Sequence, residues 1–140
     1  MGIKFTKRNG GFQIPDEGQQ DFLIQDVDIQ PPQGDPQRIE VKCINRDGIK
    51  WNNRYDLPRG ENALYVFVTR GLGFDPNDFG DDGFDPHLMI GRAFTAEIVH
   101  RQGSRGGTFA NLGQIVGPIQ PWTDEGVAVV EEDIDDDDLL

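Results

Sequence analysis

The stretch RIEVKCINRDGIKWNNRYDL, residues 38–57, decides the fold, because it holds two alternating segments joined by a strong turn signal. In residues 38–46 apolar and polar side chains alternate, which is the period-two pattern of a half-buried strand. Asp47-Gly48 favours a type I′ turn, in which both central residues have positive φ. We therefore expect strands over 38–46 and 49–57 that pair as an antiparallel hairpin.

Further alternating segments lie on both sides of this hairpin and predict three more strands, over residues 21–29, 92–101 and 107–117. Between the third and fourth strands, ENALYVFVTRGLG (61–73) places apolar residues at helical spacing and predicts one helix of about three turns. This order of elements is typical of the OB-fold. The predicted fold class is all-β (β-rich), a five-stranded OB-type Greek-key barrel with one helix between strands 3 and 4.

Charge divides the chain into two regions. The formal net charge is −12, but residues 123–140 contain nine of the 25 acidic residues and no basic one. Five more acidic residues lie in one loop: Asp75, Asp78, Asp81, Asp82 and Asp85. The rest of the chain is slightly basic, so the acidic total says little about a binding face. We expect an OB-fold domain over 1–122 and a disordered acidic C-terminal tail over 123–140.

Basic and aromatic residues gather where OB-folds bind single-stranded nucleic acid, on strands 2 and 3 and the loops after strands 1 and 4. Aromatic rings stack on bases and cations contact phosphates. The glycine-rich turn GSRGG and the strand end before it add Arg105 and Arg101. The predicted binding residues are Lys42, Arg46, Lys50, Trp51, Arg54, Tyr55, Arg105 and Phe109. The alternatives are that Trp51 and Tyr55 belong to the core and that the cations line a solvated hairpin.

The last ten residues, EEDIDDDDLL, form an acidic run that ends in two leucines. Such a run is too charged to pack, and its charge resembles that of a nucleic-acid strand. An acidic run with an apolar tip has the form of a short docking motif. We expect residues Asp135, Asp136, Asp137, Asp138, Leu139 and Leu140 to bind partner proteins, with a merely solubilising tail as the alternative.

The order of elements, the basic aromatic hairpin and the acidic tail with its apolar tip together resemble the phage-encoded OB-fold single-stranded DNA-binding proteins. This resemblance implies non-catalytic, largely sequence-independent binding of single-stranded DNA in replication and recombination. It also implies that the tail recruits replication or recombination proteins and that the stacking aromatics fall on Trp51, Tyr55 and Phe109. Two features depart from it: the tip is Leu139-Leu140 rather than Pro-Phe, and the loop 75–85 has no counterpart.

Three other interpretations compete with this one. The first is an acidic DNA mimic or inhibitor that occupies a nucleic-acid-binding partner. The second is a β module that binds calcium through the aspartates of residues 75–85, although the register does not fit an EF-hand. The third is an enzyme, which we do not expect, because His87 and His100 have no nucleophile at a known spacing.

The remaining features bound the setting of the protein. A single cysteine, Cys43, cannot form an internal disulfide, which suits a reducing compartment. No apolar stretch is long enough to span a bilayer. We expect a cytoplasmic protein, in the host cytoplasm if phage-encoded, with no cofactor, no metal and no membrane partner. A homo-oligomer is compatible with the sequence.

Overall fold

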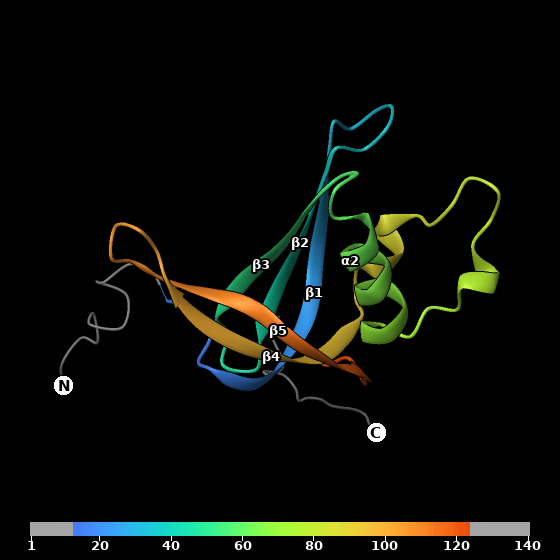
Figure 1. The fold of residues 1–140 in the computed structure, drawn as a ribbon. Coiled ribbons are helices and arrows are strands. Elements are labelled where there is room, and N and C mark those ends of the chain that lie inside the picture. The colour runs from blue at the N-terminus through green and yellow to red at the C-terminus, as the bar shows by residue number, and fades with distance from the viewer. Residues whose placement is uncertain (1–12, 124–140) are drawn as a thin grey trace, which may run out of the picture.

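The computed structural model of the protein describes residues 13–123. The strands in this range are β1 (Gly18–Gln30), β2 (Arg38–Asn45), β3 (Lys50–Asp56), β4 (Ala93–Gln102) and β5 (Thr108–Ile119) (Figure 1). A short helix, α2 (Glu61–Val66), lies between β3 and β4 and continues as a π-helical turn, Phe67–Gly71. The β-rich class, the five strands and the helix position are thus confirmed. All of the predicted tail after Thr123 lies outside the described residues, and so do the predicted partner-binding residues 135–140.

The strands form one antiparallel sheet in the order β3-β2-β1-β4-β5. The length of β1 makes this order possible, because residues 18–23 pair with β4 while residues 22–30 pair with β2. The register between β1 and β2 shifts between Ile24 and Asp26, as a β-bulge does. Bulges bend a strand and increase its twist. The sheet can therefore curve where β1 changes partner.

The turn between β2 and β3 differs from the type I′ turn that the sequence predicts. Asn45 N–H donates to the carbonyl oxygen of Ile49 at 3.0 Å, so the loop contains three residues, 46–48, instead of two. Gly48 closes it with a φ of 83°, which is typical of a three-residue hairpin loop. The side chain of buried Asn45 accounts for the extra residue, because its Oδ1 accepts the N–H groups of Asp47 and Ile49, both at 2.9 Å.

The core lies between the sheet and the helical segment and is built around three fully buried phenylalanines, Phe22, Phe67 and Phe94. The ring of Phe67 meets that of Phe94 edge to face, with 4.9 Å between centroids. Burying one such side chain contributes about 1.5–3 kcal/mol. Gly71 lets the helical segment approach β5, because a Cβ there would lie 3.2 Å from Ile115 Cγ2. The helical segment is therefore fixed to the sheet by its π-helical end.

The aspartate-rich loop before β4 is more ordered than its sequence predicts. It contains two 3-10 turns, Pro76–Asp78 and Pro86–Met89. Asp75 and Asp85 each precede one of these prolines and accept the N–H two residues later, at 2.9 and 3.0 Å. Three aromatic rings of this segment pack together: Phe74, Phe79 and Phe84. Two of the five loop aspartates thus have a capping role that needs no ligand.

Candidate nucleic-acid interface

The hairpin of β2 and β3 has one buried and one exposed face, as the alternation of its sequence predicts. On β3, Trp51, Asn53 and Tyr55 are buried, while Lys50, Asn52, Arg54 and Asp56 are exposed. The predicted cations and the predicted stacking aromatics of β3 therefore point to opposite faces of the sheet. This follows from strand geometry, because side chains whose positions along a strand differ by an odd number point to opposite faces.

Trp51 belongs to the core, with 8% of its surface exposed. Its ring lies 4.9 Å from that of Phe22, between centroids. Its indole Nε1–H donates to the carbonyl oxygen of Ala110 on β5 at 2.9 Å. The two strands at the ends of the sheet order, β3 and β5, are thus joined by a tryptophan side chain. A ring held in this way leaves little of its surface for a stacked base.

Tyr55 also belongs to the core, with 7% of its surface exposed. Its hydroxyl oxygen accepts a hydrogen bond from Asn53 Nδ2 at 2.7 Å, and its ring lies 5.9 Å from that of Phe67. Burial raises the pKa of Tyr55 well above its usual value. The core alternative therefore describes both Trp51 and Tyr55, and neither ring face is open to a base.

The predicted cations fall into two groups. Arg54 lies 3.5 Å from the carboxylate of Asp56, and Arg46 lies 2.7 Å from that of Asp21. Within residues 13–123, ion pairs are absent at Lys42, Lys50 and Arg105. Lys42, Lys50 and Arg105 therefore lose no internal ion pair when they bind a phosphate. This favours these three cations over Arg46 and Arg54 as phosphate contacts.

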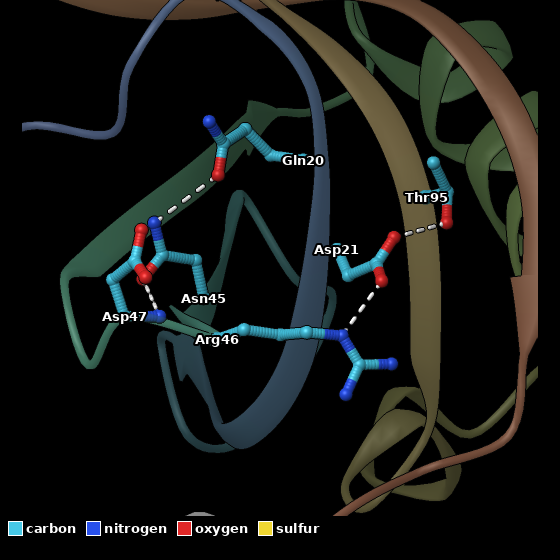
Figure 2. A network of polar contacts seen from close by, with 6 residues as sticks. All are labelled: Gln20, Asp21, Asn45, Arg46, Asp47 and Thr95. Atoms are coloured by element: carbon cyan, nitrogen blue, oxygen red, sulfur yellow. Dashed lines mark hydrogen bonds and ion pairs between the residues drawn. The ribbon is translucent and has the colours of Figure 1, made fainter.

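Arg46 is the most strongly held of the cations (Figure 2). Burial opposes ionisation of Asp21, but the hydrogen bond from Thr95 Oγ1 at 2.6 Å and the ion pair with Arg46 outweigh it, so the pKa of Asp21 is lowered. The guanidinium of Arg46 also lies 4.2 Å from the ring centroid of Trp122. Its position is thus set by two protein groups, the carboxylate of Asp21 and the ring of Trp122.

Strand β1 makes the outer face of the hairpin less basic than the hairpin sequence alone. Asp26 pairs with Lys42 across the β1–β2 register, and Asp28 pairs with Glu40. Directly paired residues share a face of the sheet. The positive charge of the outer face is therefore offset beside β1 and persists toward β3, where Lys50 stands opposite Ile44.

A cleft of about 420 Å³ lies where β3 approaches β5. We name it the β3–β5 cleft, and its lining residues are Gln13, Ile14, Lys50, Trp51, Asn52, Phe109, Ala110 and Asn111. Three of the predicted binding residues thus come together in one place, namely Lys50, Trp51 and Phe109. None of the eight lining residues is acidic.

Phe109 is the exposed aromatic of this cleft, with 55% of its surface accessible. It stands opposite Arg101 in the β4–β5 register, so the ring and the guanidinium share a face. The ring leans over Gly103, where a Cβ would clash with Phe109 Cε2. The absence of a side chain at residue 103 therefore sets the orientation of the ring.

Arg105 lies at the tip of the β4–β5 hairpin, which projects from the sheet on the side away from α2 (Figure 1). Its turn is closed by hydrogen bonds from Gly103 N–H to Gly107 O at 2.7 Å and from Gly106 N–H to Gly103 O at 3.0 Å. Gly106 has a φ of 87°, a value that favours glycine. The tip carries an exposed cation on a short, well-formed turn.

Sequence reasoning missed five of the cleft residues: Gln13, Ile14, Asn52, Ala110 and Asn111. Asn52 follows Trp51 directly and Asn111 lies two residues after Phe109, both on exposed strand positions, and this closeness in sequence is the only local signal they carry. No local pattern in the sequence indicates that the start of β3 lies against the start of β5. Trp51 and Ala110, which are hydrogen-bonded between these two strands, are 59 residues apart in the sequence.

Other chemistry-bearing groups are engaged in structural contacts. His87 lies beside Asp85 on the exposed loop, and His100 Nε2 donates to the carbonyl oxygen of Pro15 at 2.6 Å. Cys43 is buried, and burial raises the pKa of its thiol. Within residues 13–123, the structure contains no cluster of three or more histidine, cysteine, aspartate or glutamate side chains with metal-binding geometry.

No helix in the described part of the chain has the length and apolar character needed to cross a membrane. No model of a known protein family matches the chain, and a search of curated proteins likewise found no match.

Proposed function

We propose that this chain binds single-stranded DNA, without catalysis and largely without sequence preference, through the β3–β5 cleft. The observation that carries the proposal is the cleft itself. It combines an exposed aromatic, Phe109, with a cation, Lys50, that forms no ion pair within residues 13–123, and none of its lining residues is acidic. Stacking on an aromatic side chain contributes about 1–3 kcal/mol per base and tolerates every base, because each has a π face.

The strand order supports an OB-type barrel as the scaffold. In the OB-fold, a five-stranded and partly open barrel carries its ligand on the face of strands 2 and 3 and on the loops after strands 1 and 4. The order β3-β2-β1-β4-β5, with α2 between β3 and β4, is compatible with that topology. The hydrogen bond from Trp51 to Ala110 brings the ends of the sheet together, as partial closure requires.

The cations next to the cleft would then contact the phosphates. Lys50 lies in the cleft, Lys42 lies on the neighbouring strand, and Arg105 lies at the tip of the hairpin that begins beside Phe109. Asn52 and Asn111, which also line the cleft, provide neutral hydrogen-bonding groups. Such a set recognises the backbone and the π faces rather than base edges, which explains the expected lack of sequence preference.

The acidic tail would act as a competitor and as a docking segment. Its nine carboxylates begin two residues after Trp122, whose ring lies against Arg46. A tethered polyanion reaches a nearby basic cleft at high effective concentration. We propose that residues 135–140 recruit replication or recombination proteins, in a phage-type replication system in the cytoplasm.

Fluorescence anisotropy tests the central claim. Labelled oligo-dT, a duplex of equal length and an RNA of equal length are titrated with the protein at low salt. Oligo-dT should bind at least about tenfold more tightly than the duplex, because stacking needs unpaired bases. Equal affinity for both, or no binding to either, would refute the proposal.

Two variants test the role of Phe109, and one serves as a matched control. Phe109→Ala should weaken binding by about 1–3 kcal/mol, the contribution of one stacked base. Gly103→Ala should weaken it too, because the new Cβ displaces the ring without removing it. Tyr65→Ala removes a similarly exposed ring from α2, with 49% of its surface accessible, and should leave the affinity unchanged. Equal losses for Phe109→Ala and Tyr65→Ala would exclude a specific role for the cleft.

The acidic DNA mimic stays the second candidate because of the aspartates on the exposed loop 75–85. In this interpretation, the protein would bind a nucleic-acid-binding protein instead of the nucleic acid. Failure to bind oligo-dT, together with displacement of DNA from such a protein, would favour it. Replacing Asp78, Asp81 and Asp82 with Asn should then abolish the displacement, and these residues have no capping role in the loop.

A further inference from the structure

A second hollow, of about 570 Å³, lies between α2, the start of β2 and the loop that contains Phe79 and Phe84. We name it the α2–loop groove, and the apolar residues that line it include Ile39, Leu57, Leu64, Val68, Phe79 and Phe84. It shares no lining residue with the β3–β5 cleft. The β4–β5 hairpin, which carries Phe109, projects from the sheet on the side away from α2 (Figure 1). The groove is therefore a separate site.

The loop gives its side of the groove a defined shape. Gly83 N–H donates to the carbonyl oxygen of Gly80 at 2.9 Å and closes a turn. The rings of Phe79 and Phe84, on either side of this turn, lie 5.2 Å apart between centroids. A surface that is already ordered loses little conformational entropy when it binds a ligand.

The groove leaves apolar surface accessible. Leu57, Leu64, Phe79 and Phe84 are only partly buried, and Tyr65, which also lines the groove, is half exposed. Among the lining residues, Glu61 is the only charged one. The volume lies within the range of about 300–1,000 Å³ that is typical of ligand pockets. Concave apolar surface of this kind is typical of a site that binds a partner.

Carboxylates flank this apolar surface. On the loop, Asp78 directly precedes Phe79 and Asp85 directly follows Phe84, and both aspartates are exposed. Two more exposed aspartates, Asp81 and Asp82, lie in the turn between the two rings. Residues 56–91, which supply most of the groove lining, contain seven acidic residues and two arginines. This excess of negative charge opposes a nucleic-acid strand and favours lysine or arginine side chains.

We propose that the α2–loop groove binds a segment of a partner protein in which apolar side chains are flanked by lysine or arginine. The apolar side chains of the segment fill the groove, and its cations lie against the carboxylates of the loop. This inference does not depend on the proposed function, because the groove and the β3–β5 cleft have no residue in common. It also differs from DNA mimicry, which needs the carboxylates alone.

Fluorescence anisotropy with three short labelled peptides and the full-length protein tests the proposal. The first peptide contains two leucines and a phenylalanine flanked by lysines. The second has glutamates in place of the lysines, and the third has serines in place of the apolar residues. The first should bind at least about tenfold more tightly than either of the others, because only it matches both the groove and the carboxylates.

The third peptide has the same charge as the first, so it measures attraction to carboxylates anywhere in the chain. Equal affinities for the first and third peptides would overturn the proposal, and so would the absence of saturable binding of the first. Saturating oligo-dT should not displace the first peptide, and displacement would show that the groove is not a separate site. Absence of oligo-dT binding would refute only the proposed function.

Two single variants locate the peptide. Tyr65→Ala removes the half-exposed ring from the groove and should weaken binding of the first peptide by about fivefold or more, since tyrosines often dominate the energy of an interface. Val116→Ala removes a similarly exposed apolar side chain from β5, outside the groove lining, and should leave the affinity unchanged. Equal effects of the two variants would overturn the proposal.

Two double variants test the role of charge. Asp81→Asn with Asp82→Asn should weaken binding of the first peptide at least about twofold, because each exposed ion pair makes only a modest contribution. Asp16→Asn with Asp47→Asn removes the same charge from exposed positions outside the groove lining and serves as the control. Equal losses in both double variants would show that the attraction is not specific to the loop.

Sedimentation velocity distinguishes a partner segment from a second copy of this chain. A monomer at the concentration used for the peptide titration would support the proposal, because the groove is then accessible. A dimer that Tyr65→Ala dissociates would show that a second copy occupies the groove, and would overturn the proposal.

Discussion

Replacing Trp51 with alanine is the change that best separates the core from the interface. The ring is 8% exposed, lies 4.9 Å from the ring of Phe22 and donates a hydrogen bond to Ala110 at 2.9 Å. Truncating a buried tryptophan to alanine costs about 3–5 kcal/mol. Domains of this size have a free energy of unfolding of about 5–15 kcal/mol, so Trp51→Ala should remove a large part of it.

A second variant divides this cost between the ring and its hydrogen bond. Trp51→Phe keeps an aromatic ring against Phe22 but loses the donor to Ala110. It should therefore cost about 0.5–1.5 kcal/mol for the hydrogen bond, plus a smaller packing loss. If this bond holds β3 to β5, Trp51→Phe should also weaken binding in the cleft more than its effect on stability alone explains.

Urea unfolding followed by far-ultraviolet circular dichroism measures both variants. With a slope of about 1–3 kcal/mol per molar urea, Trp51→Ala should lower the midpoint by at least about 1 M. Tyr65→Ala, which removes an exposed ring, should change the free energy of unfolding by less than about 0.5 kcal/mol. An unchanged midpoint for Trp51→Ala, combined with a tenfold loss of oligo-dT affinity, would refute the core assignment and make Trp51 a stacking residue.

Three further predictions follow from the burial and charge of other residues. Because burial raises its thiol pKa, Cys43 should resist a thiol reagent in the native protein and react in urea, and rapid native labelling would contradict its burial. Because the pKa of Asp21 is lowered in the folded state, its contribution to stability is present above its usual value of 3.8 and is lost as pH falls through the lower folded value. The loss of stability in Asp21→Asn should therefore be larger at pH 7 than at pH 2, and urea midpoints that differ by the same amount at both pH values would contradict this. Removing residues 123–140 should tighten oligo-dT binding at 0.01 M salt, where the Debye length is about 30 Å, and much less at 0.15 M. Weaker binding of the shortened chain would exclude the tail as a competitor.

The strands could be predicted from the sequence because their signal is local. Alternation between apolar and polar residues over 38–46 and 49–57 depends only on the period of a strand, and β2 and β3 follow it closely. The helix likewise follows from apolar spacing in residues 61–73. The turn was the local feature predicted wrongly, because the signal Asp47-Gly48 gives no information on the side chain of Asn45, which sets the loop length.

The sequence by itself determined that β3 has two faces, one with Trp51 and Tyr55 and the other with Lys50 and Arg54. It could not determine which face is covered, because a period of two describes the strand and not its surroundings. Only the tertiary structure decided this, by packing Phe22 and Phe67 against the aromatic face. Asp26 on β1, whose position depends on sheet register, likewise offsets the charge of Lys42.

The β3–β5 cleft also depends on the tertiary structure. Its walls come from the starts of β3 and β5 and from Gln13 and Ile14, and only the curvature of the sheet brings these segments together. The sequence determined the residues that could bind a strand, since cations and aromatics are fixed by composition. The fold decided which of them meet, because contacts between distant segments arise from packing and chain topology and leave no local pattern in the sequence.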